Sequence, residues 1–428
     1  MYLLIVWRKK VIKVKKENKK CILLISDGLG DRPIEEMGYL TPLEYAKTPN
    51  IDSLVKDAMT GLVHPYKAGC TCGTDWGHLS LFGYDPAEFY TGRGSIEAYS
   101  AGLKLEKGDL AFRGNLASVN DDLVVLDRRA GRINDKEDIE QLIEAINGIT
   151  INNYTLIIKS LTEHRLAVVL RGNDLPDKIA DIDPGTAKEG EKVVDPTLGN
   201  QDLAVKTYWE LMLKVHEILN NHEVNKRRIK EGKLAANFIL TRGSGKAMVV
   251  EPFKDKYKDA KVAIIAGDAT INGIGEMCGF DSYSDDSFTG GFDTNYEGKA
   301  KLANELLNEY DLVIVHIKGT DLAGHDNLPF KKAEIISKID EMFGYWIKEN
   351  QNKDIYYAMI ADHSTPCLRR DHSQEPVPAF IYGKDVRKDE VERFGERYVA
   401  KGIINQYTGS SFIATIMDYL LLSKKYGA

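Results

Sequence analysis

Cysteine is scarce in this sequence, and its five copies are widely scattered: Cys21, Cys70, Cys72, Cys278 and Cys367. An odd number of dispersed cysteines does not make a disulfide framework and is typical of a reduced, cytoplasmic protein. Cys70 and Cys72 have a close spacing that metal and redox sites also use. Because no second cysteine pair accompanies them, we favour two small thiols in a loop.

Long apolar runs are also lacking. No stretch of about 18 apolar residues occurs, so the sequence predicts no membrane-spanning helix. At the start of the chain an apolar stretch precedes a basic one, the reverse of the order in a secretory signal. We interpret residues 1–20, with eight Lys or Arg and one Glu, as a basic N-terminal extension. A tail that contacts a membrane surface or nucleic acid is the alternative.

The rest of the chain has no excess of positive charge. The formal net charge is −7, and because residues 1–20 carry +7, the remainder carries −14. This negative charge outside residues 1–20 argues against binding of nucleic acid. Internal repeats and low-complexity segments are lacking too. With 428 residues, 28% of them charged and 43% hydrophobic, the composition is that of a globular protein of two or three domains. We expect a small-molecule substrate and no membrane partner, and we leave association into a homo-oligomer open.

Strand-like and helix-like segments alternate over much of the chain, which predicts an α/β fold built on an open sheet. Helices are predicted at 51–58, 331–349 and 411–422 from capping residues or from an apolar face at helical spacing. Short apolar runs predict strands at 21–26, 238–241, 262–266, 312–317, 355–361 and 379–382.

Between residues 112 and 234 the pattern changes to paired strands. A hairpin signal at Asn120-Asp121 separates runs at 116–119 and 123–126, and 155–159 and 165–171 make a second pair. Helices are predicted at 136–147 and 204–220. This texture predicts a smaller α+β unit. We therefore expect one domain at 21–110 plus 236–428, interrupted by a smaller inserted domain at 111–235.

Acidic residues and histidines follow three of the predicted strands. Strand 21–26 ends at Asp27, strand 312–317 is followed by a loop with Asp321 and His325, and strand 355–361 ends at Asp362-His363. The carboxyl ends of strands in an open α/β sheet meet at one edge, and carboxylate with imidazole suits Mn, Zn, Mg or Co. We predict two divalent ions, one held by Asp321, His325 and His372, and the other by Asp27, Asp362 and His363.

A two-metal site needs a nucleophile, and Thr74 is the best placed hydroxyl. Gly73 and Gly77 on either side free the backbone for close approach to a phosphate, and a metal-bound alkoxide at Thr74 attacks well near neutral pH. A threonine in a tight turn is the alternative. Guanidinium groups bind carboxylate and phosphate in a bidentate manner. The candidates to bind an acidic substrate are the cluster Arg128, Arg129 and Arg132, and singly Arg93, Arg113, Arg165, Arg242 and Lys318.

Seven segments resemble the archaeal-type cofactor-independent phosphoglycerate mutases of the alkaline phosphatase superfamily. They follow one another from residue 27 onward: DGLGDRP (27–33), TPLEYAKTPN (41–50), FGYDP (82–86), YTGRG (90–94), DRRAGR (127–132), TDLAGHD (320–326) and DHSTP (362–366). The resemblance runs from about residue 21 to the C-terminus, and its motifs are long and specific.

The resemblance implies an alkaline-phosphatase-like α/β domain with two metals, interrupted by a domain that holds the substrate. It implies interconversion of 3-phosphoglycerate and 2-phosphoglycerate in glycolysis and gluconeogenesis, through a phosphoenzyme and without 2,3-bisphosphoglycerate. Manganese is the expected ion, with zinc, cobalt or magnesium as alternatives. The implied metal ligands are Asp27, Asp321, His325, Asp362, His363 and His372, and the implied substrate-binding segment holds Arg128, Arg129 and Arg132.

One position departs from the family, whose nucleophile is a serine followed by an acidic residue, where this chain has Thr74. Other superfamily members use threonine, so a phosphothreonine intermediate is expected, although the extra methyl group restricts the side chain and crowds in-line attack. Two other functions stay open. One is a metal-dependent phosphohydrolase or phosphotransferase that acts on another phosphoester, and the other is a catalytically silent binding protein.

Overall fold

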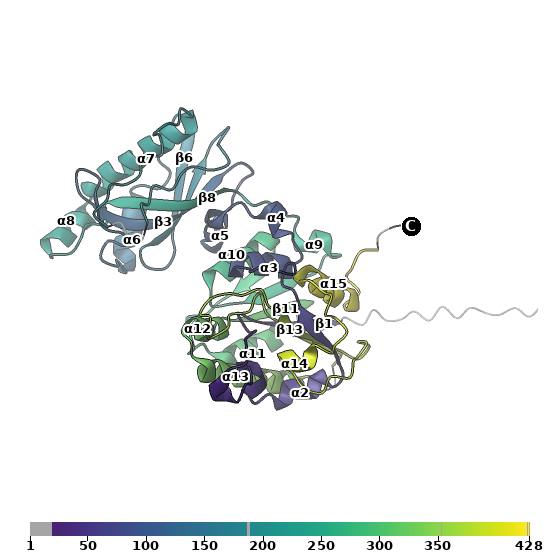
Figure 1. Cartoon of the computed structure of the whole chain (residues 1–428). Coiled ribbons are helices and arrows are strands. Elements are labelled where there is room, and N and C mark those ends of the chain that lie inside the picture. Colours follow the sequence, from purple (N-terminus) through teal and green to yellow (C-terminus); the bar gives the residue numbers. More distant parts are fainter. Residues whose placement is uncertain (1–18, 186–188, 352, 426, 428) are drawn as a thin grey trace, which may run out of the picture.

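The computed structural model describes residues 19–185, 189–351, 353–425 and 427 of the chain. Most of the predicted basic extension, residues 1–18, lies outside the described residues. Figure 1 shows two lobes. We call the lobe that holds a seven-stranded sheet the large lobe and the lobe that holds a six-stranded sheet the small lobe.

The sheet of the large lobe has the strand order β10-β9-β11-β1-β12-β13-β2. The first five strands are parallel, and β13 and β2 add an antiparallel edge. Strands β1, β11 and β12 are almost completely buried, which is why each reads as a mostly apolar run. The bounds in sheet order are Asp281–Tyr283, Val262–Ile265, Leu312–Ile317, Lys20–Ser26, Ile355–Ile360, Val377–Tyr382 and Ala58–Val63.

Helices cover both faces of this sheet. Figure 1 shows α11 (Tyr296–Leu306) and α13 (Pro329–Glu349) on one side, and α3 (Thr74–Leu81), α10 (Ala269–Cys278) and α15 (Gly409–Tyr419) on the other. The predicted helices at 331–349 and 411–422 are thus confirmed within a few residues. The helix predicted at 51–58 is α2 (Pro49–Val55). The shorter helices are η1 (Glu35–Met37), α1 (Pro42–Tyr45), α4 (Pro86–Phe89), α9 (Phe253–Lys256) and α14 (Glu396–Val399).

The small lobe contains an antiparallel sheet with the order β4-β3-β7-β6-β5. In addition, β8 pairs with β3 along the edge opposite β7. The bounds of β3 to β8 are Leu110–Val119, Val125–Asp127, Thr150–Ile151, Tyr154–Ser160, Arg165–Arg171 and Phe238–Lys246. Both predicted strand pairs are present. Helices α6 (Lys136–Glu144), α7 (Leu203–Asn220) and α8 (Glu223–Lys230) complete the lobe. Because β8 pairs with β3, this sheet continues past residue 235, to Lys246.

Two segments rich in glycine are helical, and the first of them was predicted as a loop. Asp321 and His325 lie in α12 (Gly319–His325), and residues 69–94 contain α3, α4 and the start of α5 (Arg93–Ser100). The sequence did not indicate these helices, because glycine lowers helix propensity. In the fold, the glycines allow close packing. A Cβ atom on Gly77 of α3 would lie 2.4 Å from the backbone oxygen of Asp362, and one on Gly94 of α5 would lie 2.1 Å from that of Ala111.

Helix α5 connects the two lobes, since it packs on α10 of the large lobe and on β3 and β8 of the small lobe. Each lobe has its own apolar core. Across the part of the chain that the structure describes, none of the helices combines the length and the apolar character needed to cross a membrane.

Candidate metal centre and active site

Three neighbouring strands deliver the predicted ligands to one edge of the large sheet. Asp27 follows β1, Asp321 lies in α12 just after β11, and Asp362 and His363 follow β12. Since β11, β1 and β12 are adjacent and parallel, their carboxyl ends lie side by side. All four side chains are buried. The edge predicted from the sequence is therefore where these residues meet.

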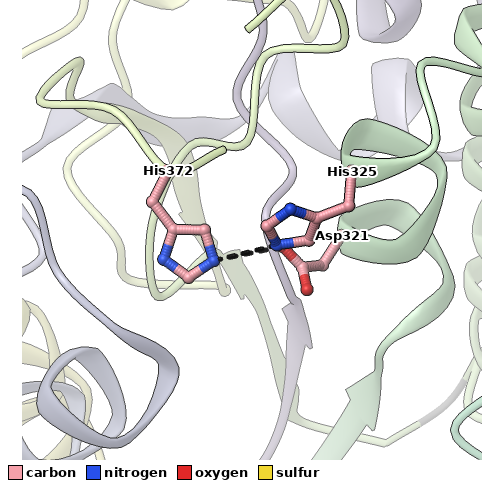
Figure 2. A group of neighbouring side chains, drawn as sticks. All are labelled: Asp321, His325 and His372. Carbon is pink, nitrogen blue, oxygen red and sulfur yellow. Dashed lines mark hydrogen bonds and ion pairs between the residues drawn. The ribbon is translucent and has the colours of Figure 1, made fainter. Parts of the chain in front are cut away.

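Asp321, His325 and His372 form the first group of ligand atoms (Figure 2). His325 follows Asp321 by one turn of α12, so both side chains lie on the same face of the helix. The Nε2 atoms of His325 and His372 lie 3.4 and 3.6 Å from Oδ1 of Asp321. The same two Nε2 atoms are 3.2 Å apart.

Backbone carbonyl groups determine the tautomers of these two histidines. Nδ1 of His325 lies 3.0 Å from the oxygen of Arg370, and Nδ1 of His372 lies 2.8 Å from the oxygen of Cys72. A carbonyl oxygen only accepts, so each Nδ1 carries the proton and each neutral ring presents the lone pair of Nε2. When both rings are neutral, the two lone pairs face each other and repel, and either a shared proton or a metal ion between the nitrogens removes this repulsion. Histidine ligands with a protonated Nδ1 on a carbonyl are common at metal sites.

A second group adjoins the first and contains Asp27, Asp321 and His363. Nε2 of His363 lies 3.4 Å from Oδ1 of Asp27 and 3.1 Å from Oδ2 of Asp362. The rings of His363 and His372 stack with centroids 3.6 Å apart. Asp321 thus belongs to both groups, whereas the sequence assigned it to the first alone.

The donor set of this centre fits divalent ions. Oδ1 of Asp27 and Oδ2 of Asp362 are buried and have no hydrogen-bond partner among the described residues. Three carboxylates and three imidazoles within contact distance combine the oxygen and nitrogen ligands that manganese, zinc, cobalt or magnesium accept. Bound cations would satisfy the buried oxygens and separate the facing imidazole nitrogens.

Thr74 is the first residue of α3, and its hydroxyl lies at this centre. Oγ1 is 3.3 Å from Nε2 of His363 and 3.3 Å from Nζ of Lys318. The close packing of Gly77 against the backbone of Asp362 holds the helix in this place. Because the N-terminus of a helix presents free N–H groups and a positive dipole end, a phosphoryl group next to Thr74 is stabilised.

Sequence reasoning did not identify two histidines next to the ligands. His78 and His316 are fully buried, and their rings contact each other with centroids 5.1 Å apart. Nδ1 of His78 lies 3.2 Å from Oδ2 of Asp362, and Nε2 of His316 lies 3.0 Å from Oδ2 of Asp27. A lone histidine inside the apolar run of β11 was the available signal for His316, whereas His78 becomes visible only once α3 is recognised as a helix.

Lys318 supplies the one ammonium group that the described residues place among these carboxylates. Its Nζ lies 3.0 Å from Oδ2 of Asp27 and 2.7 Å from Oδ2 of Asp321. Burial and the charge of Asp362 raise the pKa of Asp27 to about 7. Burial lowers the pKa of Lys318, but the three acidic groups outweigh it and raise that pKa. Negative charge is therefore in excess, and the centre attracts cations.

Four arginines gather where α5 meets the sheet of the small lobe. Arg113 on β3 is paired with Arg242 on β8, Arg165 begins β7, and Arg93 begins α5. Burial lowers the pKa of Arg113, and the charges of Arg242, Arg165 and Arg93 lower it further, although Glu97 opposes them. We call these four residues the arginine face. Such a concentration of positive charge binds an anion.

The predicted cluster at 128–132 does not form a single binding group. Arg128 is buried, and it donates through Nε to Oδ1 of Asp183 at 2.9 Å and through a second nitrogen to Oδ2. Arg132 is exposed and lines a hollow of about 320 Å³ together with Asp135 and Asp138. Arg129 is exposed, and its charge lowers the pKa of His164 beside the arginine face. Residues adjacent in sequence point to different places here because they lie on a turn.

A hydrogen bond links the segment of Thr74 to the segment that precedes Arg93. The hydroxyl of Tyr90, three residues before Arg93, donates to Oδ2 of Asp75, the neighbour of Thr74, at 2.8 Å. Trp76 packs against the ring of Tyr90 with centroids 5.5 Å apart. The contact ties the start of α3 to the segment that leads into α5.

Known proteins share both this sequence and this fold. A family described as 2,3-bisphosphoglycerate-independent phosphoglycerate mutase matches residues 56–225. The chain is 43% identical to 2,3-bisphosphoglycerate-independent phosphoglycerate mutase 1 of Methanocaldococcus jannaschii, over 96% of this chain and 99% of that protein. It is 42% identical to the corresponding protein of Pyrococcus abyssi, over 96% of this chain and all (100%) of the other.

Two solved structures are similar to this one over nearly their whole length. The PH0037 protein from Pyrococcus horikoshii has a TM-score of 0.78 and 38% identity, with 96% of this chain and 100% of that chain covered. The cofactor-independent phosphoglycerate mutase from Thermoplasma acidophilum has a TM-score of 0.72 and 32% identity, with 94% and 99% covered. The predicted α/β fold class is confirmed.

Proposed function

The chain belongs to the 2,3-bisphosphoglycerate-independent phosphoglycerate mutase family, and we propose that it interconverts 3-phosphoglycerate and 2-phosphoglycerate through a phosphothreonine at Thr74. The observation that carries this proposal is the position of the Thr74 hydroxyl, 3.3 Å from a ring nitrogen of the metal-ligand group. An alcohol beside a site for two cations is the arrangement that phosphoryl transfer to an enzyme needs.

The reaction transfers one phosphoryl group twice. Oγ1 of Thr74 gives up its proton and attacks the phosphorus, the bond from phosphorus to the glycerate oxygen breaks, and that oxygen takes up a proton. The other hydroxyl of glycerate then gives up its proton and attacks the phosphothreonine, the bond from phosphorus to Oγ1 breaks, and Oγ1 takes up a proton. Divalent ions bound by the two ligand groups supply charge neutralisation and lower the pKa of the hydroxyl. Lys318, in contact with Thr74 and two carboxylates, adds a fixed positive charge at the same place.

Glycerate must stay bound between the two transfers, because water would otherwise take the phosphoryl group and the enzyme would act as a phosphatase. We assign this task to the small lobe, at residues 110 to 246, and to the arginine face of Arg93, Arg113, Arg165 and Arg242. A planar guanidinium binds a carboxylate through two parallel hydrogen bonds. Closure of the lobes over the substrate would exclude water.

A metal-dependent phosphohydrolase or phosphotransferase with another substrate is the second candidate. The observation in its favour is Thr74, where the family has serine, because the β-methyl group restricts the rotamer from which the oxygen attacks. A coupled mutase assay with Mn²⁺ and without 2,3-bisphosphoglycerate separates the two. Turnover of 3-phosphoglycerate well above that of an aryl phosphate supports the mutase, and the reverse order supports the hydrolase.

The same proposal includes the nature of the ions and the place of action. We propose manganese as the ion, since its octahedral oxygen and nitrogen preference suits Asp and His ligands without thiolates. All five cysteines of the chain are unpaired, which supports the expected cytoplasmic location. Metal analysis of the purified protein tests the proposed manganese site. A ratio far below two ions per chain would count against this site.

A further inference from the structure

Three polar atoms beside the arginine face are buried without a hydrogen-bond partner among the described residues. They are Nε of Arg113, Oδ1 of Asn115 and Nδ1 of His164. Asn115 is 7% exposed and His164 is 6% exposed. The nearest charged atoms, in Glu97 and Glu163, lie 3.6 Å from Nε of Arg113 and 3.7 Å from Nδ1 of His164, beyond hydrogen-bond distance. Buried polar groups without partners are rare in proteins, so a cluster of them needs an explanation.

The three residues are neighbours in the small lobe. Arg113 and Asn115 are two positions apart on β3 and lie on the same face of the strand. Asn115 is paired with Arg165 at the start of β7, and the backbone oxygen of His164 accepts from the N–H of Leu116 at 2.8 Å. Burial and the charges of Arg165, Arg129 and Arg113 lower the pKa of His164, which favours the neutral ring.

The chemistry of Asn115 and His164 differs from that of the arginines around them. An arginine nitrogen donates and suits a carboxylate or phosphate, whereas the amide oxygen of Asn115 only accepts and repels an anion. The neutral ring of His164 donates from one nitrogen and accepts at the other. The partner that satisfies both residues is a hydroxyl group, which can donate and accept.

We infer that Asn115 and His164 hold the hydroxyl groups of glycerate while the arginine face holds its carboxylate. This inference rests on the proposed function, in which glycerate is the alcohol released and recaptured during the reaction. It makes Asn115 and His164 the residues that determine specificity for a dihydroxy acid. Left without partners in the free protein, their polar atoms penalise any ligand that lacks the hydroxyl groups.

The test compares the binding of glycerate and lactate, which lacks the hydroxyl at the third carbon, to the manganese-loaded enzyme by calorimetry. The wild-type enzyme is expected to bind glycerate about tenfold or more tightly than lactate, the ratio that one hydrogen bond of ordinary strength provides. In Asn115→Leu and in His164→Phe this ratio should fall towards one. Thermal unfolding without ligand should show no loss of stability in Asn115→Leu, because no partner of Oδ1 is removed.

Asn225 provides a matched control in the same lobe. It is fully buried, its Nδ2 donates to the oxygens of Leu219 at 2.8 Å and Ala236 at 3.0 Å, and its Oδ1 accepts from the N–H of Ala236 at 2.7 Å. Asn225→Leu should therefore lower the unfolding temperature and leave the binding ratio unchanged. His216→Phe is the control for His164→Phe, because Nδ1 of His216 is bonded to the oxygen of Asn237 at 2.9 Å.

Either of two results overturns the inference. One is a wild-type binding ratio in both Asn115→Leu and His164→Phe. The other is a loss of stability in Asn115→Leu as large as that in Asn225→Leu, which would show that the amide has structural partners. Mutase activity of the wild-type enzyme is measured separately. Its absence refutes the proposed function, whereas activity together with unchanged binding ratios refutes only the role of Asn115 and His164.

Discussion

At the scale of single residues, the centre depends on side chains behind the ligands as much as on the ligands themselves. His316 holds one oxygen of Asp27 at 3.0 Å, and His78 contacts both Asp362 and the backbone of Thr74. Metal ligands whose orientation is fixed by a second hydrogen bond lose less conformational freedom when an ion binds. We therefore expect the buried histidines to contribute to metal affinity without contact to the metal.

His316→Phe is expected to weaken Mn²⁺ binding about 10- to 100-fold, because Oδ2 of Asp27 loses the imidazole that orients it. Titration calorimetry of the metal-free enzyme with Mn²⁺ measures this. His216→Phe, which replaces a half-buried ring in the small lobe, should leave the affinity unaltered. Equal affinities in His316→Phe and the wild type would remove His316 from the centre.

At the scale of elements, glycine at the contact surface of α3 brings the helix to the end of β12. Gly77→Ala would place a Cβ atom 2.4 Å from the backbone oxygen of Asp362, and a backbone atom cannot move aside cheaply. Helix propensity alone favours alanine by about 1 kcal/mol. We expect overpacking to outweigh it and to lower the free energy of unfolding by about 1–3 kcal/mol, with a loss of turnover as Thr74 shifts.

Urea unfolding and turnover of Gly77→Ala measure these effects. Gly290→Ala is the matched control, because the nearest atom to its added Cβ would be 3.8 Å away. A Gly77→Ala enzyme that is more stable than the wild type would mean that helix propensity prevails and that α3 is free to move.

The strands could be predicted from the sequence, whereas the short helices could not. The difference is whether tertiary packing leaves a recognisable pattern in the local sequence. Strands β1, β11 and β12 are buried on both faces, so their residues are mostly apolar and form recognisable runs in the sequence. Helices α3 and α12 contain glycines whose value lies in tertiary contacts, and local propensity counts those glycines as helix breakers. The ligand edge followed from the strands, so it was predicted as well.

The arginine face shows the opposite case. Arg93, Arg113, Arg165 and Arg242 are far apart in sequence, and only the register of β3 with β7 and β8 brings them together. The conspicuous cluster at 128–132 is divided between an ion pair with Asp183 and an exposed turn. Proximity in sequence was therefore a poor guide to proximity in space.

At the scale of the whole molecule, transfer rather than hydrolysis requires that the small lobe retain glycerate. Arg113→Ala should raise the ratio of hydrolysis to transfer, because it removes one of the four arginines proposed to bind the carboxylate. Arg132→Ala removes a guanidinium that lies elsewhere in the same lobe and should leave this ratio unchanged. Release of inorganic phosphate and formation of 2-phosphoglycerate, measured in one reaction, give the ratio. An equal rise in both variants would contradict the assignment of the arginine face.

The buried Lys299 gives the molecule a testable dependence of stability on pH. Burial lowers the pKa of Lys299 to about 8, and its Nζ donates to the backbone oxygen of His316 at 3.1 Å. The folded state thus loses the proton before the unfolded state does, so stability rises with pH between about 8 and about 10.5. Lys299→Met should be more stable than the wild type at pH 7 by about 3 kcal/mol, and the difference should vanish near pH 10.5.

Lys332→Met is the matched control, since Lys332 is equally buried but pairs with Asp31 at 2.8 Å and donates to the oxygen of Thr365 at 3.0 Å. It should destabilise the protein at pH 7, because a buried carboxylate is left without its partner. Urea unfolding across the pH range measures both variants. A Lys299→Met curve parallel to that of the wild type would contradict the low pKa of Lys299.

The most direct test of the account is to locate the phosphoryl group after the manganese-loaded enzyme has reacted with 3-phosphoglycerate and has been quenched in acid. Peptide mass spectrometry should find phosphate on Thr74, no phosphopeptide in Thr74→Ala, and retained metal binding in that variant. Phosphate on another residue, or a Thr74→Ala enzyme that still turns over, would contradict the assignment of Thr74 as the nucleophile.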